Sequence, residues 1–272
     1  IIKCIGDVMK ICVLGEDNRS LNLRKILDSY STNIDEADCI VTPIPFTKDG
    51  EYINGERLKI DDLIDMLSKS NKILISGSIN EEICKKMKEK NICFYDLMNF
   101  EEFSIMNAIA TSEGAIKKAI EMTDFTLNNS NILILGYGRI GKILANNLSG
   151  FGAKIYCEAR KKKDIALIKS MGYNDIDLNN LDTFLPEMDI IFNTIPNMIL
   201  DKRRLKLLKK NVCVIDLASK PGGVDFEYAL QRKINLCWYL TIPSKDSPYS
   251  AAMYIKNIIC DILGEEDIWE KK

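Results

Sequence analysis

A short run in the middle of the chain, GYGRIG, has the spacing of a dinucleotide-binding turn. It lies between the apolar run NILIL, at residues 131–135, and the run IGKILANNL, at residues 140–148. In a turn of the form G-x-G-x-x-G, the first glycine permits a tight bend and the second lets the backbone approach a pyrophosphate; the third lets the helix pack closely on the strand. The N–H groups and positive dipole end of the helix then face the phosphates. The predicted ligands of a nicotinamide dinucleotide here are Gly136, Gly138, Arg139, Ile140 and Gly141.

The stretch AKIYCEARKKK begins with the next predicted strand. The end of that strand is expected to face the adenosine ribose of such a cofactor. Proteins that bind NAD usually place an acidic residue there for the ribose hydroxyls, and Glu158 is a candidate. Arg160 and the three lysines after it form a run of four cations, which suits the 2′-phosphate of NADP better than a hydroxyl. The pattern therefore favours NADP(H), with Arg160 and Lys161 as ligands. The alternative for the lysines is the solvated start of a helix.

Two later apolar runs end in polar residues, in IIFNTIPNMIL and in CVIDLASKPGGVDF. Residues at these strand ends are expected to flank the ribose and ring of the nicotinamide. The second turn contains two adjacent glycines, which indicates backbone that lies close to a ligand. Ordinary turns from strand to loop are the alternative for both. The further predicted cofactor ligands are Asn193, Thr194, Ile195, Pro196 and Ala218.

The chain contains no histidine, the side chain that moves the proton in many dehydrogenases. Its nine cysteines include no C-x-x-C pair, and most lie in or beside apolar runs. We interpret them as reduced cysteines that act as small buried hydrophobes. Without histidine or clustered thiols, no metal site is expected.

The composition is that of an ordinary soluble globular protein, and the length of 272 residues suggests two domains. A formal net charge of −2 gives no electrostatic case for binding nucleic acid or an acidic membrane surface. No apolar run reaches the roughly 18 residues of a membrane span, and the first residues lack the pattern of a secretory signal. We therefore expect a cytoplasmic protein. Met9 has the place of a natural start, which would make residues 1–8 an extra segment.

The elements that must position these residues alternate between strand and helix. In the first part of the chain, strands are expected at 10–15, 38–45, 72–78 and 92–97, and helices at 20–30, 60–70 and 80–90. This alternation predicts parallel βαβ units. Gly15, Pro45 and Gly77 fall at the carboxyl ends of strands, where ligands bind in open sheets.

The second part repeats this rhythm after a crossover at residues 98–125, irregular to helical at first and helical from Thr111. Its strands are expected near 131–135, 154–158, 190–194, 212–217 and 235–240. A final helix, 249–263, has apolar residues at helical spacing and is expected to pack on the first domain. The predicted domains are 1–104, a Rossmann domain at 105–248, and a C-terminal helix at 249–272.

The chain resembles the family of dipicolinate synthase A subunits found in spore-forming bacteria. The matching segments are GEDNRSL, MNAIATSEGAI, GYGRIG, EAR, FNTIPNMIL and DLASKPGGVDF, which are spread over nearly the whole chain in the family's order. The resemblance implies an α/β architecture in which a smaller flavodoxin-like N-terminal domain precedes a doubly wound Rossmann sheet. That architecture agrees with the alternation of strands and helices.

The resemblance also implies an NADP-linked oxidation of dihydrodipicolinate, or of its hydroxy-tetrahydro precursor, to dipicolinate during sporulation. It implies a flavoprotein-fold partner, the B subunit, on which activity can depend, and a homo-oligomer is expected as well. Loss of a hydride and one ring proton leaves an aromatic product, so a tuned histidine base is less necessary. The main task of the protein is then to position a dicarboxylate.

The resemblance and the strand ends together give the expected substrate site. Arg19 and Lys220 are the expected cations for the two carboxylates, and Glu113 is the third expected catalytic residue. The further expected substrate-binding residues are Asp17, Ser78, Asn107, Thr111, Ser219 and Lys245.

The chain departs from the family in several places. The C-terminal crossover reads LTIPSKDSPYSAA, without the family's glycine-rich GLPG, and Tyr249 stands where a lysine is expected. Glu16 replaces a glycine in the first turn, which brings a negative charge near the expected dianion. Lys220 replaces an arginine and loses its bidentate geometry. Residues 31–37 leave little room before the next strand, which suggests that the first sheet lacks one strand.

Two other functions remain open. A 2-hydroxyacid dehydrogenase shares the architecture, but its typical mechanism needs a histidine base. A nucleotide-binding scaffold subunit without turnover is favoured by Glu16, Lys220 and the altered crossover. Turnover of dihydrodipicolinate with NADP separates the scaffold from the enzyme.

Overall fold

A computed structural model describes residues 9–27 and 29–264, so residues 1–8, predicted to be an extra segment, lie outside it. The chain forms two compact units. The first contains the chain up to Asn107 together with the segment from Pro243 onward, and the second is Ala108–Ile242. The expected boundaries were after residues 104 and 248.

The first unit is built on a parallel sheet of five strands. They are β1 (Ile11–Val13), β2 (Tyr30–Ser31), β3 (Cys39–Val41), β4 (Ile73–Ser76) and β5 (Phe94–Asp96). The strand order is β2-β1-β3-β4-β5, which is the flavodoxin-like order, and every pairing is parallel. The predicted flavodoxin-like α/β domain is therefore confirmed.

The strand that the short segment 31–37 suggested was missing is present as β2. Tyr30 and Ser31 pair with Ile11 and Cys12 of β1. Two residues at the edge of a sheet cannot show the alternation of apolar and polar side chains by which strands are recognised in a sequence. The expectation of a missing strand was wrong for that reason.

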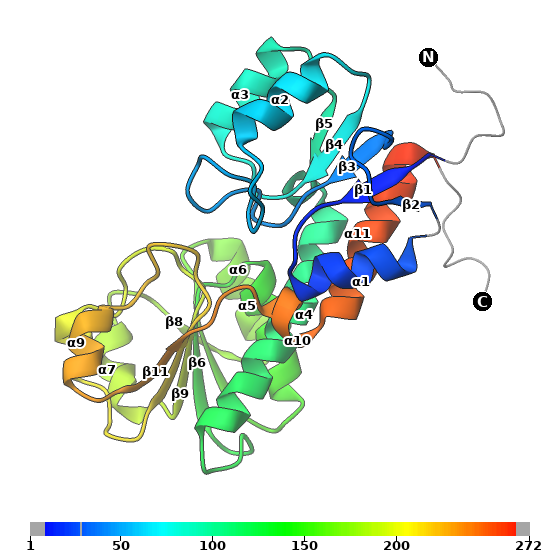
Figure 1. Cartoon of the computed structure of the whole chain (residues 1–272). Helices are drawn as coiled ribbons and strands as arrows, with labels where there is room; N and C mark the ends of the chain where they lie inside the picture. The colour runs from blue at the N-terminus through cyan, green and yellow to red at the C-terminus, as the bar shows by residue number, and fades with distance from the viewer. Residues whose placement is uncertain (1–8, 28, 265–272) are drawn as a thin grey trace. The chain divides into compact units, whose positions relative to one another are not determined.

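Helices of the first unit cover this sheet. They are α1 (Asn18–Ile26), α2 (Ile60–Ser68), α3 (Glu81–Glu89), the short 3-10 helix η1 (Leu97–Asn99), α10 (Ile242–Asp246), whose first residue belongs to the second unit, and α11 (Pro248–Leu263). The C-terminal helix α11 packs beside α1, at the opposite end of the chain (Figure 1). Ala252, Ile255 and Ile259 of α11 are buried in one cluster with Ile11 and Leu23. The expected docking of the last helix on the first domain thus has an apolar basis.

One long helix, α4 (Glu101–Met122), takes the place of the expected crossover, part of which was predicted to be irregular. Glu101 and Glu102 stand in its first turn, where negative charge is favoured by the helix dipole. α4 is therefore already helical ten residues before Thr111, where the helical part of the crossover was expected to begin.

The second unit contains a parallel sheet of six strands. They are β6 (Asn131–Leu135), β7 (Lys154–Glu158), β8 (Asn174–Ile176), β9 (Ile190–Asn193), β10 (Cys213–Asp216) and β11 (Asn235–Trp238). The strand order is β11-β10-β9-β6-β7-β8. From β6 the chain adds β7 and β8 on one side and then β9, β10 and β11 on the other, which is the doubly wound Rossmann topology. The predicted Rossmann sheet is confirmed, with β8 as a strand that the sequence analysis did not find.

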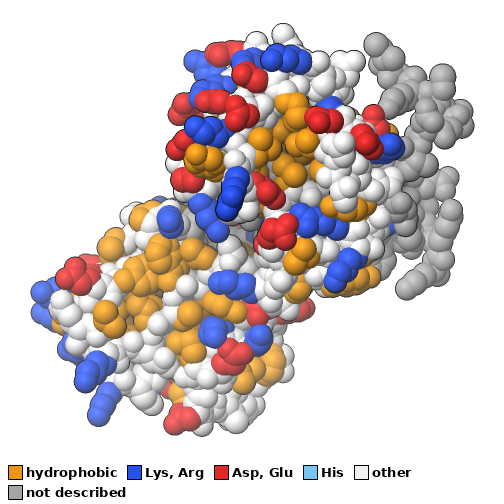
Figure 2. Space-filling model, in the orientation of Figure 1, with side chains coloured by type: hydrophobic (Ala, Val, Ile, Leu, Met, Phe, Trp, Pro, Cys, Tyr) orange, Lys and Arg blue, Asp and Glu red, His pale blue; other side chains and the backbone are white. Residues whose placement is uncertain are grey.

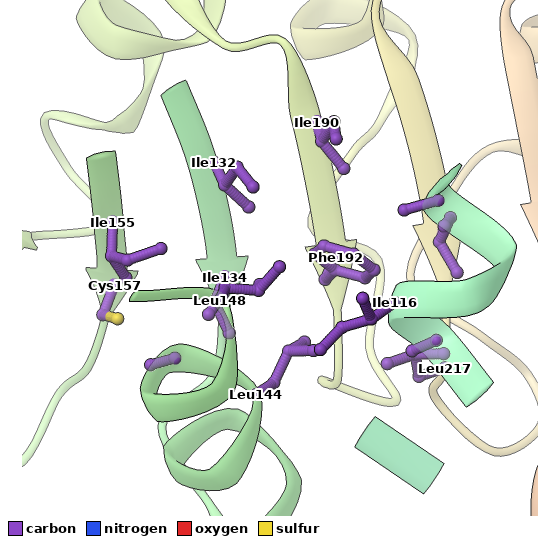
Figure 3. Close-up of a cluster of buried hydrophobic side chains, with 14 of the residues drawn as sticks. Ile116, Ile132, Ile134, Leu144, Leu148, Ile155, Cys157, Ile190, Phe192 and Leu217 are labelled. Carbon is purple, nitrogen blue, oxygen red and sulfur yellow. The ribbon is translucent and has the colours of Figure 1, made fainter. Parts of the chain in front are cut away.

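Apolar side chains on both faces of this sheet are covered by helices. The elements are α5 (Arg139–Ser149), α6 (Lys162–Ser170), α7 (Leu181–Phe184), η2 (Leu185–Glu187), α8 (Lys202–Leu205) and α9 (Phe226–Gln231). Figure 3 draws Ile132 and Ile134 of β6 in one buried cluster with Leu144 of α5 and Ile116 of α4. The alternate residues Leu133 and Leu135 belong to the cluster on the opposite face. Because both faces are buried, β6 is apolar from Ile132 to Leu135.

The surface is mixed in charge. On the face that Figure 2 shows, lysine and arginine side chains are interspersed with aspartate and glutamate. Within the described residues, no helix is both long and apolar enough to cross a membrane. The same residues hold no group of three or more cysteine, aspartate or glutamate side chains placed to bind a metal ion.

The packing of α11 gives a prediction for stability. Ile259 is 1% exposed within the apolar cluster of the first unit. Ile259→Ala should lower the free energy of unfolding by about 2–5 kcal/mol, because it removes buried methyl groups and leaves a cavity. Asp261→Ala, an exposed change on the same helix, should alter it by less than about 0.5 kcal/mol. Urea denaturation followed by circular dichroism measures both, and equal effects would contradict the docking of α11.

Candidate functional site

The glycine turn of the second unit is fixed by close backbone packing. Gly136 follows β6 with a φ of +92°, a conformation that favours glycine, and a Cβ there would lie 2.4 Å from Thr194 Oγ1. A Cβ on Gly141 would lie 2.1 Å from the carbonyl oxygen of Gly136. Gly136 is thus required by its φ and by Thr194 after β9, and Gly141 by the close approach of α5 to the turn, in the roles that the motif predicts for them.

The middle glycine, Gly138, has a different environment. A Cβ on Gly138 would meet no atom within 4 Å, so nothing in the protein itself requires glycine there. Gly138 is the N-cap of α5, and no side chain makes a capping hydrogen bond. The first N–H groups of α5 are therefore not capped by a side chain, which is the arrangement that binds phosphate at helix N-termini. Arg139 beside it is exposed, and Ile140 packs on the core under the turn.

The end of β9 is tied to the glycine turn and to β10. The Oγ1 hydroxyl of Thr194 donates to the carbonyl oxygen of Leu135 at 2.9 Å. The amide of Asn193 is fully buried and donates to Asp216 Oδ1 at 2.8 Å and to the carbonyl oxygen of Ile195 at 3.0 Å. Among the expected cofactor ligands here, the Asn193 amide already hydrogen-bonds other groups of the protein. Pro196 is exposed.

Asp216, at the end of β10, organises the turn that follows it. Its Oδ1 accepts a hydrogen bond from the backbone N–H of Ala218 at 3.0 Å, and its Oδ2 accepts one from Gly223 at 2.8 Å. The carboxylate is fully buried and, with the Asn193 amide, has three donors. Charge-assisted bonds of this kind contribute about 1.5–3 kcal/mol each. Asp216 was recognised in the sequence only as a polar strand end, without this role.

The two adjacent glycines of this turn have an internal explanation. A Cβ on Gly222, whose φ is +83°, would lie 2.9 Å from Asp216 Oδ2. A Cβ on Gly223 would lie 2.2 Å from the side-chain nitrogen of Asn193. The protein's own packing therefore accounts for both glycines, and they give no separate evidence of a ligand. Ser219 and Lys220, between Ala218 and these glycines, are exposed.

The end of β7 places a buried carboxylate beside exposed cations. Glu158 is 2% exposed, and its Oε1 finds no hydrogen-bond partner among the described residues. Burial raises the pKa of Glu158, against the lowering effects of a hydrogen bond from the Gly136 N–H and of the Arg160 charge. Arg160 is exposed, and so is Lys161, the N-cap of α6. The two expected ligands of a 2′-phosphate thus lie beside an acidic group.

In the first unit, the segment after β1 is held by Asp17. Its carboxylate caps α1 by accepting hydrogen bonds from the backbone N–H groups of Arg19 and Ser20, and it also accepts one from the Ser244 hydroxyl of α10 at 2.8 Å. Burial alone would raise the pKa of Asp17, but the charge of Arg19 and the hydroxyls of Ser244 and Ser20 outweigh it and lower that pKa. Because Asp17 caps α1, the helix begins at Asn18, before the predicted start at Ser20.

Arg19, expected to bind a substrate carboxylate, is only 5% exposed. Its guanidinium donates to the carbonyl oxygen of Ile44 at 2.8 Å and lies 4.0 Å from Asp17. Glu16, the charge that replaces a glycine of the family, is paired with Arg24 at 3.2 Å. The added negative charge of this turn is therefore paired with a cation of α1, the helix that follows it.

The other expected substrate residues lie on three elements. Ser78 follows β4, is exposed and has a φ of +58°, which is uncommon for a serine. Its backbone N–H and that of Ile79 donate to the Asp96 carboxylate, at 3.0 and 2.9 Å, and this holds the strained turn. Asp96 is a second acidic residue whose positioning role the sequence did not reveal.

The remaining expected residues differ in exposure. Along α4, Asn107 is half-buried, Thr111 is buried and Glu113 is exposed. Asn107 and Thr111 share one face of this helix by their spacing of four, whereas Glu113 lies off that face. Lys245, in α10, is exposed.

Comparisons with known proteins agree with this division of the chain. A family model described as the N-terminal domain of the A subunit of dipicolinate synthase matches residues 8–98. A second, described as the NAD-binding domain of D-isomer specific 2-hydroxyacid dehydrogenases, matches residues 102–231 and includes the glycine turn. The second unit is therefore a nicotinamide dinucleotide-binding fold, and the match supports an oxidoreductase.

The relatives cover almost the whole chain. The A subunit of dipicolinate synthase from Bacillus subtilis is 30% identical over 297 residues, which span 97% of this chain and 99% of the relative. The crystal structure of its counterpart from Bacillus halodurans has a TM-score of 0.84 at 28% identity and covers 95% of this chain and 98% of its own. That of the Bacillus subtilis protein has a TM-score of 0.83 at 26% identity, covering 94% and 96%. The chain belongs to the family of dipicolinate synthase A subunits.

Proposed function

We propose that this protein oxidises dihydrodipicolinate, or its hydroxy-tetrahydro precursor, to dipicolinate with NADP. Membership of the family, over nearly the full length of the chain, supports the reaction. The observation that carries the proposal is the glycine turn, in which Gly136 and Gly141 are required by packing while Gly138 has free space above it. Open space beside Gly138 is what the close approach of a pyrophosphate to the backbone needs.

The residues of the second unit fit a nicotinamide dinucleotide. We assign the uncapped N–H groups at the start of α5, next to Gly138, to the pyrophosphate. Arg160 and Lys161 are assigned to the 2′-phosphate of NADP, since both are exposed at the end of the neighbouring strand β7. The bound cofactor supplies the hydride acceptor.

In this reaction the main role of the protein is to position the substrate, and proton transfer is a smaller part of catalysis. Dihydrodipicolinate loses a hydride and one ring proton, and its hydroxy-tetrahydro precursor loses one water as well; the gain in aromaticity drives these losses. The chain has no histidine, and Glu113 is the proposed residue that orients the substrate or accepts the proton. Arg19 and Lys220 are the proposed ligands of carboxylates, and the further substrate ligands remain those predicted from the sequence.

A nucleotide-binding subunit without turnover is the second candidate. The observation that favours it is the buried state of Arg19, whose guanidinium already donates to the Ile44 carbonyl. A cation with its donors engaged inside the protein is a weaker ligand for a substrate. A 2-hydroxyacid dehydrogenase activity is disfavoured because the chain has no histidine to act as its base.

We further propose that the chain acts with a flavoprotein-fold B subunit, and that it forms a homo-oligomer, in the cytoplasm of a sporulating cell. Family membership is the support for this partner. No nucleic-acid or membrane partner is proposed, since the net charge of −2 offers no attraction to polyanions.

Turnover tests the function directly. The purified chain, with and without the B subunit of a relative, should form NADPH from NADP and dihydrodipicolinate, followed by absorbance. Lys220→Met should raise KM by about 10- to 100-fold, as expected for one lost charged hydrogen bond, and Lys220→Arg should restore it. The exposed Lys210→Met serves as the control with unchanged kinetics. Tight nucleotide binding without turnover under either condition would favour the scaffold.

The glycine turn gives a paired prediction. Gly141→Ala should lower the free energy of unfolding by about 1–3 kcal/mol or more, because its Cβ would meet the Gly136 carbonyl at 2.1 Å. Gly138→Ala should leave stability within about 0.5 kcal/mol and weaken NADPH by about tenfold or more. Thermal unfolding and calorimetric titration separate the two effects. If Gly138→Ala bound NADPH normally, the assigned pyrophosphate site would be wrong.

Cofactor choice rests on Arg160. NADPH should bind more tightly than NADH, and Arg160→Ala should weaken NADPH by about 1–3 kcal/mol while leaving NADH nearly unchanged. Lys154→Ala, which removes an exposed cation at the opposite end of β7, is the matched control and should leave both affinities unchanged. Isothermal titration calorimetry measures these affinities. Equal or tighter NADH binding by the unmodified protein would refute the NADP assignment.

A further inference from the structure

The segment between β3 and α2 contains a hairpin, which we define as residues 52–59. Tyr52 and Lys59 form an antiparallel bridge, and the backbone N–H of Ile53 donates to the carbonyl oxygen of Leu58 at 3.0 Å. Ile53 is fully buried in one apolar cluster with residues of α2, so the base of the hairpin is anchored in the core. The tip of the hairpin, residues 54–57, is therefore carried on a fixed support.

The tip is hydrogen-bonded to the segments that follow β1 and β3. The Asn54 side chain donates to the carbonyl oxygen of Pro45, after β3, at 3.1 Å. The Glu56 carboxylate accepts a hydrogen bond from the backbone N–H of Gly15, after β1, at 2.5 Å. In the order β2-β1-β3-β4-β5, the chain adds β2 on one side of β1 and β3 on the other. Open sheets bind ligands at the carboxyl ends beside this reversal, and the tip borders that place.

All three arginines of the first unit lie near this edge of the sheet. Arg19 donates to the carbonyl oxygen of Ile44 at 2.8 Å, and Arg24 donates to that of Gly15 at 2.7 Å. Arg57, in the hairpin tip, is exposed and makes no hydrogen bond or ion pair with the described residues. An arginine side chain stays charged and has five N–H donors. Arg57 therefore has donors available for a partner from outside the described chain.

The acidic side chains around the tip are bonded to other groups. Glu16 is paired with Arg24 at 3.2 Å, and the Glu56 carboxylate accepts the N–H of Gly15. The planar fork of an arginine matches a carboxylate, because it can donate two parallel hydrogen bonds to it. A carboxylate of a bound ligand is thus a suitable partner for Arg57 at this edge.

We propose that Arg57 binds one carboxylate of the substrate and makes the site select dicarboxylates over monocarboxylates. This inference rests on the proposed function, in which the substrate has two carboxylates. Arg19 is 5% exposed with one donor engaged, and Arg57 adds a freely available cation beside the same strand ends. The hairpin tip is then part of the substrate site. Glu56 is a positioning residue, because its bond to Gly15 holds the tip there.

The first test compares two ligands that differ by one carboxylate, dipicolinate and pyridine-2-carboxylate. Titration calorimetry of the full chain with NADP present measures the ratio of their affinities. In Arg57→Met the ratio, dipicolinate over pyridine-2-carboxylate, should fall by about tenfold or more, as expected for one lost charged hydrogen bond. Arg57→Lys should restore part of it, since it keeps the charge and loses the fork.

A second cation of the same hairpin provides the matched control. Lys59 is exposed and already paired with Glu51 at 3.3 Å. Lys59→Met removes the same charge from the hairpin and should keep the ratio within about twofold at physiological salt, where distant surface charges are screened. The melting temperature of each variant shows that it is folded.

Chemical modification gives a readout that needs no variant. Phenylglyoxal reacts with accessible arginine side chains, and mass spectrometry of the digested protein locates the modified residues. Dipicolinate should slow the modification of Arg57, and pyridine-2-carboxylate should slow it much less. Arg232, which is exposed in the second unit, should react at the same rate with and without either ligand. A purely structural role of Arg57 would give no such protection.

The outcomes separate this inference from the proposed function. If dipicolinate did not bind to the unmodified protein, the proposed function and this inference would both fail. If it bound and Arg57→Met kept the original ratio, the role of Arg57 would be refuted and the proposed function would stand. Equal losses of affinity for both ligands, or an equal fall of the ratio in Lys59→Met, would also refute it. The protection experiment decides the question if Arg57→Met does not fold.

Discussion

The nucleotide-binding end of the second unit depends on the hydrogen bonds that the Asp216 carboxylate accepts. A charge buried this deeply is tolerated only if donors replace the lost water, and three do so. The backbone of the following turn supplies two of them, and the Asn193 amide supplies the third. One ion thereby fixes the turn that carries Ser219 and Lys220 and also joins the ends of β9 and β10.

The same end of the sheet shows why its residue types are so constrained. Thr194 bonds the carbonyl of Leu135 and occupies the space that a side chain on Gly136 would need. Gly223 leaves room for the Asn193 amide, which in turn bonds Asp216. Each small residue is explained by a neighbour that must come close. Gly138 stands apart, because a Cβ there would meet no described atom of the protein within 4 Å.

In the first unit, too, acidic side chains hold the segments that follow the strands by accepting hydrogen bonds from backbone N–H groups. Asp17 caps α1 and accepts the Ser244 hydroxyl from α10, which joins a segment near the start of the chain to one near its end. Asp96 bonds two N–H groups after β4 and holds Ser78 at a positive φ. Carboxylates are well suited to this task because each can accept several backbone N–H bonds. Glu158 differs from all of these, because one of its oxygens has no donor among the described residues.

The sequence by itself determined the fold class, the glycine turn and most of the strands, because these depend on periods and spacings that local physics imposes. It identified Gly136 and Gly141 correctly, since a strand, a tight bend and a helix in succession leave few alternatives. It missed β2, whose two residues show no period, and it did not reveal the internal packing that requires Gly222 and Gly223. Only the tertiary structure revealed that Asn193, Asp216 and these glycines satisfy one another, because their contacts join segments far apart in the chain. For the same reason, only the fold could separate the bonded carboxylate of Asp216 from the unpaired oxygen of Glu158, as burial and hydrogen bonding are decided by neighbours that no local pattern specifies.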